Sequence, residues 1–209
     1  MDTAALQAKA TDIRKDILTM IPEAGSGHPG GSLSCTDILT ALYFGGVMDY
    51  NPADPHKPGR DRFILAKGHA APALYATLAH AGFFPIDELR TLRKLGTRLQ
   101  GHPDSNLLPG VEVSTGSLGQ GLSVAAGLAA GLRLTGEDGL VFTVLGDGEC
   151  EEGQVWEAAM FAAHQKLGRL VAIIDNNELQ IDGCIHDVCD PGDLGEKFAA
   201  FGWDVQRVC

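Results

Sequence analysis

The chain has 209 residues, of which 44% are hydrophobic, and its formal net charge is −11. This length suits one well-buried domain, which we predict over residues 1–209, and is short for two. The acidic charge argues against a general role on nucleic acid or on anionic membranes, because such roles depend on basic surfaces.

The amino-terminal segment predicts a helix followed by a glycine-rich loop. Apolar residues recur at helical spacing over residues 3–20, which predicts a first amphipathic helix. Pro22 and Gly25 are expected to end this helix, since proline breaks helices and glycine favours their carboxyl ends. Residues 25–32 (GSGHPGGS) then predict a tight loop around one histidine.

A second helix, a surface loop and a short strand are predicted next. Ser34 and Asp37 have the spacing of a capping box, so we expect them to begin the second helix. Residues 51–62 are rich in proline and charge, which predicts a surface loop. The strand predicted at 63–66 is followed by Lys-Gly-His at 67–69, which places polar groups at the carboxyl end of a strand.

The middle of the chain predicts helices around a long irregular stretch. The predicted segments are helices at 71–80 and 87–94, an irregular stretch at 96–113 and a helix at 122–134. The irregular stretch contains Gly-His-Pro at 101–103, and a loop of this length inside a domain is usually functional. The run 116–121 (GSLGQG) leads directly into the last of these helices.

Two apolar runs predict adjacent, buried, parallel strands. The runs 140–145 (LVFTVL) and 170–175 (LVAIID) flank an amphipathic segment at 156–167 that predicts the crossover helix. The remaining predicted segments are a loop at 178–191, a helix at 194–201 and a last strand at 203–208. This pattern predicts an α/β fold in which a mostly parallel sheet has helices on both faces.

A polar motif follows each of these two strands. Gly146-Asp147-Gly148 follows the first, and Asn176-Asn177 follows the second. Because the carboxyl ends of parallel strands meet at one sheet edge, a carboxylate and an amide oxygen could there hold a hard cation and a phosphate group. Alternatively, Asp147 could cap the following helix and Asn177 could make a turn.

The five cysteines are odd in number and lack paired C-x-x-C spacing, which favours a reduced, cytoplasmic setting. Cys184, His186 and Cys189 are close in sequence, but a zinc site is disfavoured because a fourth ligand at a familiar spacing is missing. The amino-terminal segment does not have the pattern of a signal peptide, and no apolar run reaches the ~18 residues of a membrane span.

Five motifs occur together along the chain. They are Ser26-Gly27-His28, Lys67-Gly68-His69, Gly101-His102-Pro103, the run 114–121 (STGSLGQG), and the Gly-Asp-Gly to Asn-Asn pair. In order and spacing they resemble the amino-terminal portion of transketolases over nearly the whole chain. The Gly-Asp-Gly to Asn signature is shared by thiamine diphosphate enzymes generally, whereas the three histidine motifs point to transketolase. The resemblance implies the thiamine diphosphate-binding fold.

The resemblance also implies how the cofactor would be held. Asp147, the side chain of Asn177 and the backbone carbonyl of Leu179 would bind Mg²⁺ together with two diphosphate oxygens and a water molecule. Gly148 and His69 would donate hydrogen bonds to the diphosphate. Such a mixture of a few protein oxygens and phosphate oxygens is the set of ligands that Mg²⁺ prefers.

Further residues would contact the other end of the cofactor and the sugar. Gly116, Ser117 and Leu118 would line the cofactor beside its aminopyrimidine. His28 and His102 would contact the sugar hydroxyls and assist proton transfer. A lone histidine is usually structural, but three histidine motifs in separate glycine-containing loops favour function. Glu152 matches an interface glutamate coupled to cofactor activation, although an acid there also suits a helix dipole.

A second chain is expected to complete the site. In the family, the glutamate that activates the cofactor and the arginines that grip the sugar phosphate belong to a pyrimidine-binding domain, which this chain lacks. The chain therefore resembles the amino-terminal subunit of a split transketolase, in a heterotetramer with a separate carboxy-terminal subunit. Together they would transfer a two-carbon ketol unit between sugar phosphates with thiamine diphosphate and Mg²⁺; alone the chain should be inactive.

The resemblance implies a longer subunit, since this chain ends at Cys209, before the segment in which the family has a Gly-His turn. We therefore expect either a truncated product or fragment, or a chain in which the family's full site has been reduced. This shortness predicts an exposed sheet edge and exposed apolar surface. One alternative is a related enzyme, either 1-deoxyxylulose-phosphate synthase or a specialised ketolase, although the GSLGQG run favours transketolase over the synthase. From a different class, the chain could be a non-catalytic remnant that binds the cofactor or a partner.

Overall fold

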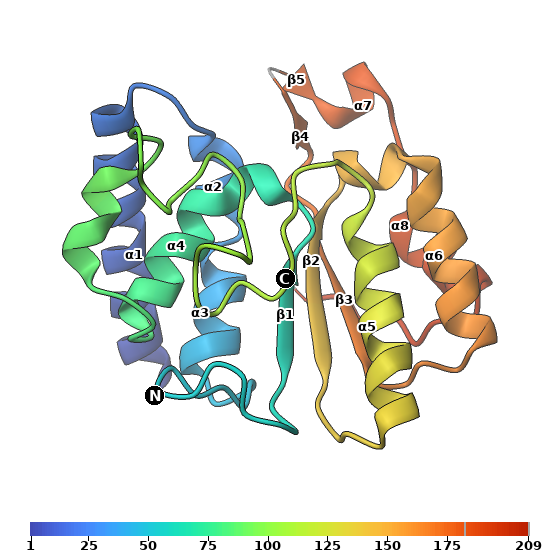
Figure 1. Ribbon diagram of the computed structural model, residues 1–209. Helices are drawn as coiled ribbons and strands as arrows, with labels where there is room; N and C mark the ends of the chain where they lie inside the picture. Colours follow the sequence, from blue (N-terminus) through green and yellow to red (C-terminus); the bar gives the residue numbers. More distant parts are fainter. Residues whose placement is uncertain (182, 209) are drawn as a thin grey trace.

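The computed structural model describes residues 1–181 and 183–208. Its central sheet has three parallel strands in the order β1-β2-β3, namely β1 (Arg62–Leu65), β2 (Val141–Gly146) and β3 (Leu170–Asp175). Leu65 lies opposite Val144, and Gly146 lies opposite Asp175. The carboxyl ends of all three strands therefore reach the same edge of the sheet (Figure 1).

Helices cover both faces of this sheet, which confirms the predicted α/β fold (Figure 1). One layer contains α1 (Thr3–Ala24), α2 (Pro29–Ser34), α3 (Thr36–Phe44) and α4 (Ala71–His80). The other contains α5 (Gly121–Thr135), α6 (Gly153–His164) and α8 (Leu194–Ala200). The short elements are the 3-10 helices η1 (Gly68–Ala70), η2 (Ile86–Thr91) and η3 (Gly148–Glu151), the hairpin of β4 (Leu179–Gln180) and β5 (Gly183–Cys184), and α7 (Ile185–Val188).

Successive side chains along a strand point to opposite faces of the sheet, so the hydrophobic core consists of two clusters, one on each face. Phe63 and Leu65 of β1 pack with α1, α3 and α4, whereas Ile64 packs with α5 and α6. Every residue of β2 is buried, as expected for an apolar strand covered on both faces. In the described chain β3 pairs with β2 alone, and most of its residues are only half-buried, so β3 forms an exposed sheet edge.

The first predicted helix and loop differ from the structure at two prolines. α1 continues through Pro22 and ends before Gly25, whose φ of 64° allows the left-handed cap. Pro22 is tolerated because it lies in the last turn, where its missing N–H removes one backbone hydrogen bond only. The loop predicted at 25–32 is wrong in its second half, because Pro29 occupies the first turn of α2, where its fixed φ suits a helix start.

The predicted capping box is also wrong. α3 begins after Cys35, and no described side chain caps its first turn. Ser34 instead donates to the carboxylate of Asp175 at 2.7 Å, and Asp37 accepts two hydrogen bonds from Arg14 at 2.9 and 2.7 Å. These charge-assisted bonds to distant partners are stronger than the local bonds that a capping box offers.

The segment predicted as a helix at 87–94 forms the 3-10 helix η2 only as far as Thr91, and residues 92–94 are not helical. In an α-helix, the Leu92 N–H would donate to the carbonyl of Glu88. The Thr91 hydroxyl donates to that carbonyl at 2.8 Å, and the Leu92 N–H donates to the carbonyl of Leu89 at 3.2 Å. The threonine side chain therefore competes with the α-helical bond.

Two predictions near the carboxyl end need correction. The segment 178–191, predicted as a loop, contains β4, β5 and α7, while Asp182 within it lies outside the described residues. Residues 203–208 were expected to form a strand, but none is found in this described segment. Trp203 donates to the carbonyl of Ala159 at 3.0 Å and Arg207 pairs with Asp193 at 2.5 Å, so the segment folds back onto α6 and α8; Cys209 lies beyond the described residues.

The start of α5 provides a test of this packing. A Cβ atom at Gly121 would lie 2.3 Å from the Cβ of Ala66, whereas no described atom lies within 4 Å of one at Gly131. We expect Gly121→Ala to lower the free energy of unfolding by about 1–3 kcal/mol, because the helix must move away from β1. Gly131→Ala on the same helix should raise it by about 0.5–1 kcal/mol through helix propensity. Urea unfolding measures both, and equal effects would contradict the close contact.

Candidate functional site

Polar residues that follow the three central strands lie at one edge of the sheet. Lys67 follows β1, Asp147 follows β2 and Asn177 follows β3. The Asp147 N–H donates to the carbonyl of Asp175 at 3.3 Å, and the Glu178 N–H donates to Oδ2 of Asp147 at 2.7 Å. The structure therefore brings the Gly-Asp-Gly and Asn-Asn motifs together as expected, while their metal-binding role stays a prediction.

The carboxylate of Asp175 links several of the polar residues at this edge of the sheet. Lys67 Nζ donates to one of its oxygens at 2.7 Å, and Ser34 Oγ donates to the other at 2.7 Å. Ser34 Oγ in turn accepts from the side-chain amide of Asn177 at 3.2 Å. Lys67 is 1% exposed and Asp175 is 7% exposed, so the ion pair is buried. The sequence showed Lys67, Asp175 and Asn177 at strand ends but gave no signal that they form one network with Ser34.

The structure contains both hydrogen bonds expected from the alternative interpretations, namely a helix cap at Asp147 and a turn at Asn177. Asp147 Oδ1 accepts from the Gly148 N–H at 2.9 Å as the cap of η3, and Asn177 Oδ1 accepts from the Leu179 N–H at 2.9 Å in a turn. A carboxylate or amide oxygen has a second lone pair, so these bonds leave both oxygens able to bind a cation. The Gly148 N–H is used by Asp147, so donation to a diphosphate would have to share or replace this bond.

The residues at this edge fit Mg²⁺ and a diphosphate. Asp147, which is 2% exposed, and Asn177 offer a carboxylate and an amide oxygen, and hard cations prefer such ligands. A Cβ atom at Gly31 would lie 3.1 Å from Nε2 of His69, and one at Gly116 would lie 3.0 Å from the ring of His102. The absence of a side chain at these two glycines thus lets the rings of His69 and His102 pack directly against the backbone.

The three predicted histidines lie within electrostatic reach of one another. The rings of His28 and His69 are 5.4 Å apart. Burial, followed by the charges of Lys67, His28 and His102, lowers the pKa of His69 to about 4. Burial, followed by the charges of Arg93 and His28, also lowers the pKa of His102. His69 is therefore uncharged at neutral pH and can donate a hydrogen bond through one ring N–H.

Glu149, which the sequence reasoning missed, anchors the loop that carries Gly116, Ser117 and Leu118. Glu149 is 3% exposed, and its two oxygens accept from the N–H of Gly119 at 3.1 Å and of Gly146 at 3.2 Å. Burial raises the pKa of Glu149 to about 7 against the effect of these bonds. The available signal was its position directly after the Gly-Asp-Gly motif.

The predicted residues at the outer margin of the site are exposed. Ser117 and Leu118 lie at the surface of their loop, and Glu152 is exposed at the start of α6. A Cβ atom at Gly119 would lie 2.4 Å from Cβ of Glu152, so Glu152 borders the same loop. Thr115 Oγ1 in this loop is buried and has no hydrogen-bond partner in the part of the chain that the structure describes.

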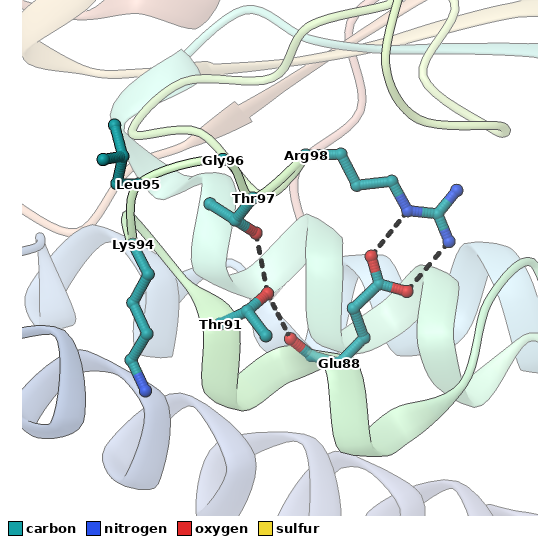
Figure 2. Close-up of a pocket in the computed structure, with 7 residues that line it drawn as sticks. All are labelled: Glu88, Thr91, Lys94, Leu95, Gly96, Thr97 and Arg98. Carbon is teal, nitrogen blue, oxygen red and sulfur yellow. Dashed lines mark hydrogen bonds and ion pairs between the residues drawn. The ribbon is translucent and has the colours of Figure 1, made fainter.

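Other parts of the molecule offer fewer features of an active site. A surface pocket of about 550 Å³ lies beside η2, lined by Glu88, Thr91, Lys94, Leu95, Gly96, Thr97 and Arg98 (Figure 2). Its polar groups pair with one another, because Arg98 binds Glu88 at 2.5 and 2.8 Å and the hydroxyls of Thr91 and Thr97 are 2.7 Å apart (Figure 2). None of these residues belongs to the predicted site.

The region around Cys184, His186 and Cys189 does not form a metal cluster. Among residues 1–181 and 183–208, no three His, Cys, Asp or Glu side chains gather so that they could hold a metal ion. His186 pairs instead with Asp190 at 3.1 Å. In the same described ranges, the helices lack the combination of length and apolar content needed to cross a membrane.

The parallel sheet, the polar edge at its strand ends and the histidines packed against glycine backbone fit a thiamine diphosphate-binding α/β domain. Residues 6–209 match the family model described as transketolase, thiamine diphosphate binding domain. The chain belongs to the transketolase family, a family of thiamine diphosphate-dependent transferases. The predicted resemblance, the enzyme class and the cofactor are thereby confirmed.

Relatives show how this domain occurs in other proteins. The chain is 47% identical to the 6-deoxy-6-sulfo-D-fructose transketolase subunit SqwG of Clostridium sp. (strain MSTE9), over 97% of this chain and 74% of that subunit. It is 42% identical to an apulose-4-phosphate transketolase subunit of Phocaeicola vulgatus, over 100% of this chain and 73% of that subunit. The solved transketolase from Leishmania mexicana superposes with a TM-score of 0.88 at 35% identity, over 94% of this chain and 31% of that chain. The predicted similarity to a split amino-terminal subunit is confirmed.

The desolvation of His69 predicts a pH dependence. In the unfolded chain His69 gains a proton below about pH 6.5, but in the folded chain only below about pH 4. Because the unfolded state binds more protons in this interval, stability falls as the pH falls from about 6.5 to about 4. We expect His69→Gln to lose less stability on acidification than the original chain, as measured by urea unfolding at several pH values.

The matched control is His164→Gln, since His164 is exposed at the end of α6. This variant should keep the original pH dependence. If the two variants behave alike, His69 is not the source of the effect.

Proposed function

We propose that this chain supplies the diphosphate-binding half of a transketolase active site, as one thiamine diphosphate and Mg²⁺-binding domain. A second chain with a pyrimidine-binding domain would supply the other half. Together they would transfer a two-carbon ketol unit between sugar phosphates. The observation that carries this proposal is that the motifs of Asp147 and Asn177 lie together at the sheet edge where β2 and β3 end. Two relatives named as transketolase subunits support it.

The proposed cofactor contacts follow from the geometry of that edge. Asp147, Asn177 and the carbonyl of Leu179 would hold Mg²⁺, while Gly148 and His69 would donate hydrogen bonds to the diphosphate. Thiamine diphosphate, when bound, supplies the carbon that accepts the ketol unit.

The loop of Gly116, Ser117 and Leu118 would line the aminopyrimidine side. It is fixed to the end of β2 by Glu149, which accepts the N–H groups of Gly119 and Gly146. A fixed loop would hold the cofactor in one orientation, which removes the need to order it in each catalytic cycle.

The three histidines would have different roles: His102 and His28 would transfer protons, and His69 would donate a hydrogen bond. Desolvation and the charge of Arg93 lower the pKa of His102, which favours its uncharged form, the form that can accept a proton from a sugar hydroxyl. His28 would act beside it at the same sugar. His69, with a pKa of about 4, stays uncharged through the reaction and would serve as a hydrogen-bond donor instead.

A partner surface is proposed next to the cofactor site. Leu118, Leu179, Ile181 and Val188 are exposed apolar residues of the glycine-rich loop and of the segment around the β4–β5 hairpin and α7. Such surface next to a site is typical of a protein interface. We infer that the pyrimidine-domain subunit covers it in a heterotetramer, with Glu152 at its margin.

The substrate and compartment are proposed on other grounds. Since the two relatives are named for 6-deoxy-6-sulfo-D-fructose and apulose-4-phosphate, the specialised ketolase alternative is favoured over a general pentose phosphate enzyme. We propose that the protein acts in carbohydrate metabolism in the cytoplasm, a reducing compartment. Free thiols fit such a compartment, and the four described cysteines, Cys35, Cys150, Cys184 and Cys189, are all free.

The test is ketol transfer by this chain assembled with its pyrimidine-domain partner. Transfer should require both chains, thiamine diphosphate and Mg²⁺. Asp147→Ala should abolish measurable transfer and weaken Mg²⁺-dependent cofactor binding by about a hundredfold, because a direct metal ligand is lost. Isothermal titration calorimetry of the assembled complex measures the affinity.

Asp204→Ala is the matched control, since Asp204 is an exposed carboxylate far along the chain from the strand ends. It should leave affinity and turnover unchanged. Unchanged Mg²⁺-dependent affinity in Asp147→Ala would contradict the metal role. Cofactor binding without transfer, in a correctly assembled complex, would favour the non-catalytic alternative.

A further inference from the structure

Arg93 lies between two of the histidine loops. Its Nη1 donates to the hydroxyl of Ser26 at 2.9 Å, and its Nη2 donates to the carbonyl of Gly101 at 3.4 Å. Ser26 belongs to the loop that carries His28, and Gly101 directly precedes His102. One guanidinium thus joins segments that are far apart in the sequence.

The contact with the second loop is close and specific. A Cβ atom at Gly101 would lie 3.0 to 3.3 Å from three guanidinium atoms of Arg93, so the group packs closely against the bare backbone of Gly101. Arginine presents several N–H donors in a rigid planar fork, which lets it donate to two separated acceptors at once. A lysine could supply the charge but not this fork.

The backbone of Arg93 is strained. Its φ of 57° lies in the left-handed region, which costs a residue other than glycine about 1–2 kcal/mol. Its Nε is buried and lacks a partner within the described residues. Strain of this kind persists where the surroundings fix the residue, and it is concentrated at functional sites.

Other contacts fix the remaining sides of the His102 loop. The Arg93 N–H donates to the carbonyl of Leu99 at 2.9 Å, which closes the base of the loop. The Tyr75 hydroxyl from α4 lies 2.9 Å from the carbonyl of Gln100 and 3.1 Å from that of His102. Tyr75 therefore holds the loop against α4, while the Arg93 side chain is the described bridge from it to the loop of His28.

We propose that Arg93 is a positioning residue for the ketol-transfer site, whose guanidinium holds the His28 and His102 loops at a fixed separation and places a constant positive charge beside them. Its catalytic meaning rests on the proposed function, but the bridging itself rests on the contacts above. A fixed separation matters because proton transfer requires both imidazoles at hydrogen-bonding distance from the same sugar.

The charge of Arg93 has a separate, measurable effect. After desolvation, Arg93 is the largest influence that lowers the pKa of His102. The other titratable groups that face His102 are His28, His69 from η1 and Tyr75 from α4, whose pKa is raised by burial; Asp104 lies on the same loop. Removal of the Arg93 charge should therefore raise the pKa of His102.

The test compares three variants of this chain by two measurements that need neither cofactor nor turnover. Hydrogen–deuterium exchange follows the backbone of segments 25–28 and 100–102, and an NMR titration follows the pKa of His102. Arg93→Gln should increase exchange in both segments together by about tenfold, since hydrogen bonds to a charged group are lost. It should also raise the pKa of His102.

Arg93→Lys separates positioning from charge. It should increase exchange in both segments, because the fork is lost, but keep the pKa of His102 low. Arg90→Gln, which removes the same charge from an exposed site in η2, should change neither measurement. Increased exchange in one segment only, unchanged exchange in Arg93→Gln, or an unchanged pKa of His102 in that variant would overturn the proposal. Because no activity is measured, these outcomes are distinct from a failure of the proposed ketol transfer.

Discussion

The buried carboxylate of Asp175 is the constraint on which the candidate site depends. One oxygen binds Lys67, the other binds Ser34, and the backbone carbonyl binds the N–H of Asp147. Ser34 then orients the amide of Asn177. Loss of one partner of such a buried pair leaves an uncompensated charge, which typically costs about 3–5 kcal/mol. The groups that follow all three strands are therefore coupled, and the two side chains proposed as metal ligands, Asp147 and Asn177, have positions set by the same residue.

This network also determines how an acidic chain can bind a diphosphate. Lys67 is a cation just past the end of β1, but its ammonium group is 2.7 Å from Asp175 and is already neutralised. His69 is uncharged at neutral pH, because its pKa is about 4. Backbone N–H groups and a neutral imidazole can orient a diphosphate, but they do not cancel its charge. That task falls to a divalent cation on Asp147 and Asn177, which explains why a protein of net charge −11 would bind such a ligand through a metal.

The sequence predicted the parts of the fold that depend on local pattern, including the parallel strands, the helix layers and the edge where the polar motifs meet. Burial on both faces makes β2 a continuous apolar run. β3 matches its predicted bounds, but its predicted burial is wrong, because most of its residues are only half-buried at the sheet edge. The errors occur where a contact with a residue far away in the sequence determines the local structure. Ser34 was expected to cap a helix, but its partner Asp175 is 141 positions away. The role of Arg93 was missed because the sequence placed it in a predicted helix at 87–94, whereas its left-handed backbone and its contact with Ser26 depend on distant residues. Glu149 could have been found from its place after the Gly-Asp-Gly motif.

The central claim is that Asp147 and Asn177 hold one metal ion at the diphosphate end of thiamine diphosphate. Crystals of the chain assembled with its partner, grown with thiamine diphosphate and Mn²⁺, would show the metal in an anomalous difference map. We expect one peak at about 2.2 Å from the carboxylate of Asp147 and the amide oxygen of Asn177, next to the cofactor phosphates. A bound cofactor whose metal peak lies away from both oxygens would contradict this claim.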